Sequence, residues 1–262
     1  MNFIQPSIDP ILLTIGFLEL RWYSLAYIFG FIIGSIALKR LNKISGQIID
    51  DKKLDSFFIW AVLGVILGGR IGYVFFYQIN LFTNNPYYIF EIWNGGMSFH
   101  GGLIGLIISI YFFTKKINIS FFYLSDLICL VAPIGIFLGR VANFINTELI
   151  GRPTDFFISV VYPSIDNLHR HPSQLYEALF EGIVLFIILN IYFLKYNNAN
   201  RVGYTSGLFL IIYSVFRIFL EFLREPDTHI GLYFNFISTG QILSLPLLLF
   251  GIFILGFYAT KK

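Results

Sequence analysis

The chain has 262 residues, of which 56% are hydrophobic and only 13% are charged, and its mean hydropathy is +0.74. About a quarter of the residues of a soluble domain are charged, so this composition excludes an ordinary soluble protein and indicates a protein embedded in a membrane. The formal net charge of +3 is informative by its location along the chain, and no nucleic-acid partner is expected.

Residues 1–20 contain no Lys or Arg and therefore lack the positive start of a signal peptide. We expect them to lie at the membrane interface as an amphipathic segment. Seven apolar stretches follow, each about as long as the roughly 18 residues that a membrane-spanning helix needs. They lie at about 22–41, 57–79, 97–114, 121–139, 176–194, 204–223 and 237–258. The sequence thus predicts an all-α, polytopic membrane protein with a single membrane-embedded domain over residues 1–262.

Basic residues gather in alternate connections between these predicted spans and at the end of the chain. They are Lys39, Arg40, Lys43, Lys52, Lys53, Lys115, Lys116, Lys195, Arg201, Lys261 and Lys262. Because cytoplasmic loops carry an excess of Lys and Arg, these connections are predicted to be cytoplasmic. The N-terminus and the segment 140–175 then lie outside, and the C-terminus lies inside.

Polar residues gather on the predicted outer side instead. Five stretches contain them: 21–23, 94–102, 139–155, 170–182 and 213–227. Because all five stretches are expected at the same face of the membrane, they predict a functional site there.

Glycines recur at four-residue spacing in three predicted spans. The sets are Gly30 with Gly34, Gly64 with Gly68 and Gly72, and Gly101 with Gly105. Such stripes are typical of closely packed membrane helices. Arg70, in the middle of span two, costs roughly 2.5–3.5 kcal/mol at a bilayer centre and so predicts a polar partner, which the sequence does not identify.

His100 lies next to the pair Gly101–Gly102, whose missing side chains would leave the imidazole open to a bound molecule. An imidazole suits proton transfer at neutral pH, although a histidine near a helix start can equally be structural. His169 and His171 stand two residues apart without a matching carboxylate pattern, so no metal is assigned.

Arg140 ends span four and is followed by Asn143, Asn146 and Glu148. A guanidinium suits a phosphate and amides suit glycerol hydroxyls, so this group predicts a site for an anionic phospholipid headgroup. It is part of the stretch "GRVANFINTELIGRPTD" at residues 139–155.

Span six places Arg217, Glu221 and Arg224 at positions i, i+4 and i+7, with Tyr213 one turn earlier. The ladder could neutralise itself as a structural element. Its excess positive charge favours the alternative, an anion site.

Gln174, Glu177 and Glu181 keep a similar helical spacing in span five. They could neutralise buried arginines such as Arg70, or they could bind substrate. Their spacing alone does not decide between these two roles.

These stretches resemble the bacterial prolipoprotein diacylglyceryl transferases, in the order in which that family has them. The matching segments are "GGRIGYVFFY", "WNGGMSFHGGLIG", "GRVANFINTELIGRPTD", "RHPSQLYEALFEG", "FRIFLEFLREPD" and "GQILSLP". Ala142 stands where the family usually has glycine. The segment between Thr154 and Arg170 is short, which implies a reduced extracytoplasmic head region.

The resemblance implies a reaction, its partners and its place. The family moves the diacylglyceryl group of phosphatidylglycerol to the lipobox cysteine thiol beside the signal peptide of a prolipoprotein. The products are a thioether and glycerol phosphate, and the step is the first of bacterial lipoprotein maturation. No cofactor is expected, and the active site is expected on the outer side of the bacterial inner membrane.

The resemblance also implies roles for individual residues. Arg140 and Arg217 would stabilise the phosphate charge, and His100 is the candidate base for the thiol. Activation of the thiol by the fields of the arginines is the alternative. Four further residues match positions that the family uses around the headgroup: Tyr23, Asn143, Glu148 and Gly151. Supporting residues would be Glu221 and Arg224, which orient Arg217, together with Tyr213, Asp126 and Arg70.

A lipid or small-anion transporter is the main alternative. It would also carry arginines on its spans, but it is typically built from internal repeats with broken helices, and the two halves of this chain show no repeat. A metal-dependent phosphatidyl transferase would need clustered aspartates, which the chain lacks.

Overall fold

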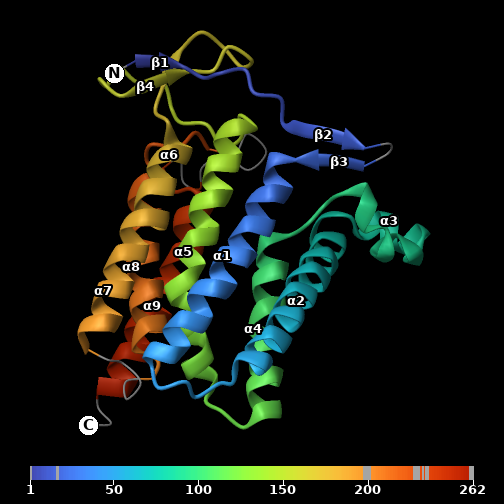
Figure 1. The fold of residues 1–262 in the computed structure, drawn as a ribbon. Helices are drawn as coiled ribbons and strands as arrows, with labels where there is room; N and C mark the ends of the chain where they lie inside the picture. Colours follow the sequence, from blue (N-terminus) through green and yellow to red (C-terminus); the bar gives the residue numbers. More distant parts are fainter. Residues whose placement is uncertain are drawn as a thin grey trace. The chain divides into compact units, whose positions relative to one another are not determined.

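The computed structural model describes residues 2–15, 18–196, 202–226, 231, 233 and 236–259 (Figure 1). Arg201, Lys261 and Lys262 of the predicted cytoplasmic residues lie outside this part of the chain. Two compact units form, one of Met1–Leu41 with Asp126–Lys262 and the other of Asn42–Ser125.

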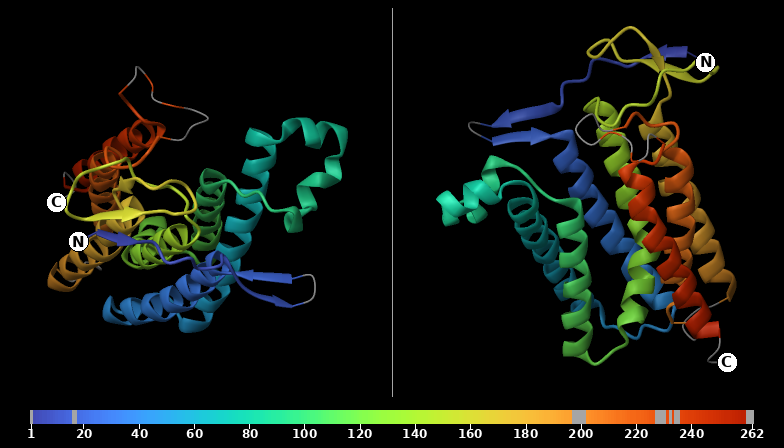
Figure 2. Two further views of the ribbon diagram at one scale, coloured as in Figure 1. Left: turned by 90° about the horizontal axis from the view of Figure 1, so that it is seen from above. Right: turned by 180° about the vertical axis from the view of Figure 1, so that it is seen from behind.

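The first unit is built on a set of helices that run side by side (Figures 1 and 2). Helix α1 (Trp22–Ile44) and helix α5 (Phe121–Ile145) each pass from one unit to the other. Next comes one continuous helix made of α6 (Ser173–Glu177), the π-helical segment η3 (Ala178–Val184) and α7 (Leu185–Tyr196). Helices α8 (Tyr204–Leu220) and α9 (Thr239–Ala259) complete the unit.

Five helical segments of the described chain are long and apolar enough to cross a membrane: Trp22–Ile44, Asp51–Tyr77, Phe121–Ile145, Ser173–Tyr196 and Thr239–Phe257. Large apolar side chains on them are exposed, as expected of surfaces that face lipid; Ile36, Ile59 and Phe253 are 65%, 63% and 63% exposed. The prediction of a polytopic helical membrane protein is therefore confirmed. The number of seven spans stays a prediction, since these five segments include neither the helix at the predicted span 97–114 nor the shorter apolar helix α8.

The second unit contains helix α2 (Asp51–Tyr77), the short helices α3 (Ile79–Asn84), η1 (Pro86–Phe90) and η2 (Ile92–Asn94), and helix α4 (Phe99–Ile117). Helices α2 and α4 pack through their glycines. A Cβ added to Gly105 would lie 1.9 Å from the carbonyl oxygen of Gly64, and one on Gly68 would lie 2.3 Å from that of Gly101. The predicted close packing of these two stripes is confirmed. The stripe on α1 differs, because a Cβ on Gly34 would meet no atom within 4 Å.

Two small sheets belong to the first unit. Strand β1 (Asn2–Ile4) pairs in parallel with β4 (Ser159–Val161), which pairs antiparallel with β5 (His169–Arg170). Strands β2 (Ile11–Ile15) and β3 (Leu18–Arg21) form a hairpin. The expected amphipathic lead-in is thus a pair of β-elements. Asp9 accepts a hydrogen bond from the backbone N–H of Ile11 at 2.8 Å, a turn that opens the hairpin instead of a helix.

Candidate functional site

A buried group of five charged side chains, here called the charged cluster, lies where α5, α6, η3 and α8 meet in the first unit. Glu177 bridges two arginines, since its oxygens lie 2.9 Å from Nη1 of Arg140 and 2.7 Å from Nη1 of Arg217. Glu181 lies 3.1 Å from Nη2 of Arg140 and 3.7 Å from Nη1 of Arg217. Nη2 of Arg217 lies 2.7 Å from Glu221. The cluster therefore joins residues from four segments of the chain.

The cluster is enclosed. The side chains of Glu177 and Glu181 are fully buried, while those of Arg140 and Arg217 keep 16% and 10% exposure. Removal of one partner from a buried ion pair typically lowers stability by about 3–5 kcal/mol, because the other charge is left buried without a partner.

Local sequence explains how the cluster forms. Glu177 and Glu181, like Arg217 and Glu221, are spaced by one helical turn, so each pair projects from one face of its helix. Glycine at position 240 in the first turn of α9 makes room for Glu221, because a Cβ there would lie 2.8 Å from both carboxylate oxygens. Tyr213 on α8 lies within electrostatic range of Arg140, Arg217, Glu177 and Glu181.

The predicted Arg217–Glu221–Arg224 ladder is only partly present. Helix α8 ends at Leu220, and Arg224 lies in an extended bridge opposite Gly151 rather than on the helix face. The predicted excess of positive charge is also absent from the cluster, because Glu177 and Glu181 join it and three carboxylates meet two guanidinium groups. These glutamates pair with Arg140 and Arg217 rather than with Arg70.

The end of α5 carries the predicted headgroup residues one turn beyond Arg140. Asn143 donates a hydrogen bond to Glu148 at 2.8 Å, and the backbone N–H of Glu148 donates to the carbonyl of Asn143 at 2.9 Å. Asn146 donates to the other oxygen of Glu148 at 3.3 Å. Gln174 donates to the carbonyl of Glu148 at 2.6 Å, so α6 fixes this turn in place.

The following loop is strained and tightly held. Thr147 and Leu149 have φ angles of 57° and 56°, a region that bulky residues rarely adopt. Ser173 donates to the carbonyl of Leu149 at 2.7 Å. A Cβ on Gly151 would lie 2.0 Å from the carbonyl oxygen of His171, so only glycine allows the loop to lie this close. Strain held in place by neighbouring segments is typical of functional loops.

Arg170 fastens this loop, and sequence reasoning missed its role. Its guanidinium donates to Asp166 at 2.6 Å, to the carbonyl of Gly151 at 3.0 Å and also to Glu225. The hydrogen bond from Arg170 holds the pKa of the Asp166 carboxyl below its usual range. An aspartate four residues before the arginine was the one local signal in the sequence.

Arg70 belongs to the second unit, where it organises a loop. It donates four hydrogen bonds to backbone carbonyls, those of Tyr88 at 2.6 Å, Ile89 at 3.2 Å, Gly95 at 2.6 Å and Gly96 at 3.3 Å. Its guanidinium also stacks on the ring of Tyr88, 4.6 Å from the centroid. The polar partners of Arg70, which the sequence does not identify, are therefore backbone carbonyl groups.

Asp126 caps a helix. It accepts hydrogen bonds from the backbone N–H groups of Gly203 and Ser206 at 2.6 and 2.7 Å, and from the Ser206 hydroxyl at 2.6 Å. These groups open α8, whereas Arg217 lies near its end, about 16 Å further along at the rise of an α-helix. The structure thus separates Asp126 from the charged cluster.

The remaining predicted residues lie at helix starts. His100 is exposed in the first turn of α4, with its ring against Phe99. Gly101 beside it is explained by helix packing, since a Cβ there would lie 2.2 Å from the carbonyl of Gly68, rather than by access to the imidazole. Tyr23 lies in the first turn of α1 in the first unit, and its ring contacts that of Tyr27 edge to face with 5.2 Å between the ring centroids.

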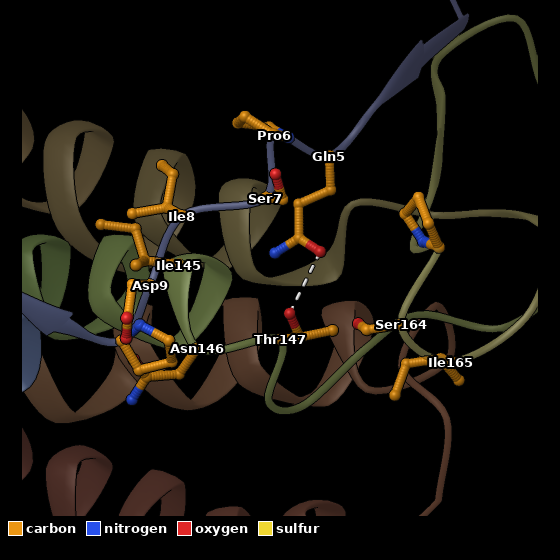
Figure 3. A pocket seen from close by; sticks show the side chains of 12 residues that line it. Gln5, Pro6, Ser7, Ile8, Asp9, Ile145, Asn146, Thr147, Ser164 and Ile165 are labelled. Atoms are coloured by element: carbon orange, nitrogen blue, oxygen red, sulfur yellow. Dashed lines mark hydrogen bonds between the residues drawn. The ribbon is translucent and has the colours of Figure 1, made fainter.

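A cavity of about 600 Å³ lies beside the end of α5 in the first unit (Figure 3). It is lined by Gln5–Pro10, Ile145–Thr147 and Pro163–Ile165. Gln5 accepts a hydrogen bond from the Thr147 hydroxyl at 3.1 Å across it. Neither Arg140 nor Arg217 lines this cavity. The charged cluster is therefore the better candidate for a site that binds an anion.

Comparison with known proteins identifies the family of the chain. Residues 10–257 match the family described as prolipoprotein diacylglyceryl transferase. A phosphatidylglycerol–prolipoprotein diacylglyceryl transferase of Rickettsia bellii is 49% identical over 95% of both chains. One of Pseudoalteromonas atlantica is 50% identical over 95% of this chain and 89% of its own length. The chain therefore belongs to the prolipoprotein diacylglyceryl transferase family of enzymes.

Proposed function

We propose that the chain transfers the diacylglyceryl group of phosphatidylglycerol to the lipobox cysteine thiol of a prolipoprotein, which yields a thioether and glycerol phosphate. The names of its relatives support this reaction. The observation that carries the assignment of residues is the pair of buried guanidinium groups, Arg140 and Arg217, held side by side by Glu177.

The reaction breaks a carbon–oxygen bond and leaves its electron pair on the phosphate. Arg140 and Arg217 stabilise that developing charge, since preorganised cations act most strongly where water is excluded. Glu221 orients Arg217 through its 2.7 Å ion pair. Because the nucleophile is the thiol of the substrate, the chain itself supplies charge stabilisation and orientation.

The turn after α5 is the proposed seat of the glycerol headgroup. Asn143 and Glu148 offer an amide and a carboxylate next to Arg140, and the backbone of Gly151 closes the turn. Tyr23 opens α1 in the same unit, and its hydroxyl is the proposed fourth headgroup contact. Together these groups would align the displaced carbon with the thiol.

His100 is the proposed base that takes the thiol proton. The thiolate is the nucleophilic form of cysteine, and the imidazole of His100 is exposed and can accept the thiol proton. The match to the family's His-Gly-Gly motif supports this role.

The proposed topology has seven spans, with the N-terminus outside and the C-terminus in the cytoplasm of a bacterial inner membrane. In the first unit, Lys39 and Lys195 lie at the ends of α1 and α7, and the charged cluster lies at the other end of the helices. With the lysines inside, the cluster and the segment 140–175 would face outward, where a prolipoprotein emerges.

The test incubates purified protein with labelled phosphatidylglycerol and a lipobox peptide. A matched peptide with serine in place of cysteine is the control. A transferase releases glycerol phosphate only with the cysteine peptide and attaches the lipid to it. A transporter would move the lipid without releasing glycerol phosphate, and that result would contradict the proposal.

A further inference from the structure

The two arginines of the charged cluster already hold carboxylates. Arg140 is paired with Glu177 and Glu181, and Arg217 with Glu177 and Glu221. Both Nη atoms of each arginine lie against carboxylate oxygens, and a phosphodiester that binds across the ends of the two guanidinium groups needs these same Nη atoms. Lipid phosphate can bind both arginines in this way only when at least one carboxylate yields its place.

Glu181 makes the longest ion-pair contacts of these three carboxylates. Its Oε1 lies 3.7 Å from Arg217, and its other oxygen lies 3.1 Å from Arg140. Glu177, by contrast, touches both arginines within 2.9 Å. Glu181 also belongs to the π-helical segment η3, whose wider turn is common at functional sites.

A carboxylate that loses its cation in this place cannot stay charged at low cost. The side chain of Glu181 is fully buried, and burial without a partner disfavours the ionised form. The charged and titratable groups that face it are Arg140 from α5, Glu177 from α6, and Tyr213 and Arg217 from α8, with Glu221 behind Arg217. The incoming phosphodiester adds a further negative charge.

We propose that binding of the lipid phosphate displaces Glu181 from Arg140 and that Glu181 takes up one proton as it yields. Glu181 is thus a binding-site residue whose protonation is coupled to occupation of the arginine pair by a phosphodiester. This inference rests on the proposed function, since it takes the phosphate of phosphatidylglycerol as the ligand.

The test measures the affinity of the purified protein for phosphatidylglycerol in mixed micelles between pH 6 and 8.5. Because binding takes up a proton, affinity should fall as the pH rises, by up to about tenfold per pH unit. Glu181→Gln should bind without this dependence, and at the highest pH more tightly than the wild type. Glu19→Gln makes the same chemical change in the exposed β2–β3 hairpin and should keep the wild-type slope.

Calorimetric titration of the wild type in two buffers with different ionisation heats gives a second readout that needs no variant. It should detect uptake of up to one proton per lipid. A constant affinity without proton uptake would overturn the inference, and so would a pH slope that Glu181→Gln retains, because the proton would then reside elsewhere, for example on a histidine.

Transfer to the peptide thiol is measured in the same preparations. Normal transfer combined with pH-independent binding would overturn the coupling to Glu181 and leave the proposed function standing. Absence of both lipid binding and transfer would overturn the headgroup site and the coupling together.

Discussion

Replacement of Gly151 by alanine tests whether the loop after α5 has to lie where the structure shows it. The added Cβ would lie 2.0 Å from the carbonyl oxygen of His171, so one of the two segments must move by at least about 1 Å to reach an allowed separation. Such a shift would stretch the hydrogen bond from Arg170 to the carbonyl of Gly151, now 3.0 Å, beyond its useful range.

Two backbone hydrogen bonds flank the same position. Arg152 donates to Leu223 at 2.9 Å, and Glu225 donates to Ile150 at 3.0 Å. Neutral hydrogen bonds contribute about 0.5–1.5 kcal/mol each and charged ones about 1.5–3 kcal/mol. Partial loss of all three, offset by the reduced entropy of the unfolded alanine chain, predicts a destabilisation of about 2–4 kcal/mol.

The matched control is Gly139→Ala, in the same sequence stretch. A Cβ at this helical position meets no atom within 4 Å, and alanine favours helix over glycine by about 0.8–1 kcal/mol. The assay compares thermal unfolding in detergent and transfer from phosphatidylglycerol for both variants. Gly151→Ala should unfold at a lower temperature and lose about a hundredfold in rate through misplacement of the headgroup turn. Equal stability and activity of the two variants would show that the loop does not need to lie this close to His171.

Three further predictions address other parts of the molecule. Because the folded-state pKa of Asp166 is depressed, its ion pair with Arg170 stabilises the fold above the ordinary pKa of about 3.9 and is lost as the pH falls through the folded value. The unfolding midpoint of the wild type should therefore approach that of Asp166→Asn below about pH 4, and a gap that stays constant with pH would contradict this. Gly105→Ala should lower the midpoint by overpacking α2 against α4, a cost of about 1–3 kcal/mol, whereas Gly34→Ala should not, and equal midpoints would argue against the glycine contact. Asp126→Ala should cost about 0.5–2 kcal/mol as a lost helix cap and leave the KM for phosphatidylglycerol unchanged, so a raised KM would show that Asp126 supports lipid binding as well.

The positions of the long helices could be predicted from the apolar stretches, because the apolar character and the length of a stretch can be read directly from the sequence. The predicted start of span five at residue 176 falls within three residues of the start of α6 at Ser173. The close packing of α2 and α4 could also be predicted, since glycines at four-residue spacing are typical of closely packed membrane helices.

Other features depend on partners that sequence spacing does not reveal. Glu177 and Arg217 are forty residues apart, and Arg70 is satisfied by backbone carbonyls that every residue carries. The hairpin at the start of the chain was missed because its apolar residues suit a strand as well as an interfacial helix. The end of α8 before Arg224 was missed because the charges keep helical spacing beyond it.

Arg140 and Arg217 are proposed to bind together the phosphate that leaves. The rate of thiol-dependent glycerol phosphate release by Arg140→Lys and Arg217→Lys tests this role, because lysine keeps the positive charge near the glutamates but cannot bind an anion through two parallel N–H groups. Arg21→Lys, on the exposed hairpin, is the control. We expect losses of about 100- to 1,000-fold in kcat/KM for the two cluster variants, with unchanged folding. Release at the wild-type rate by both would contradict this role.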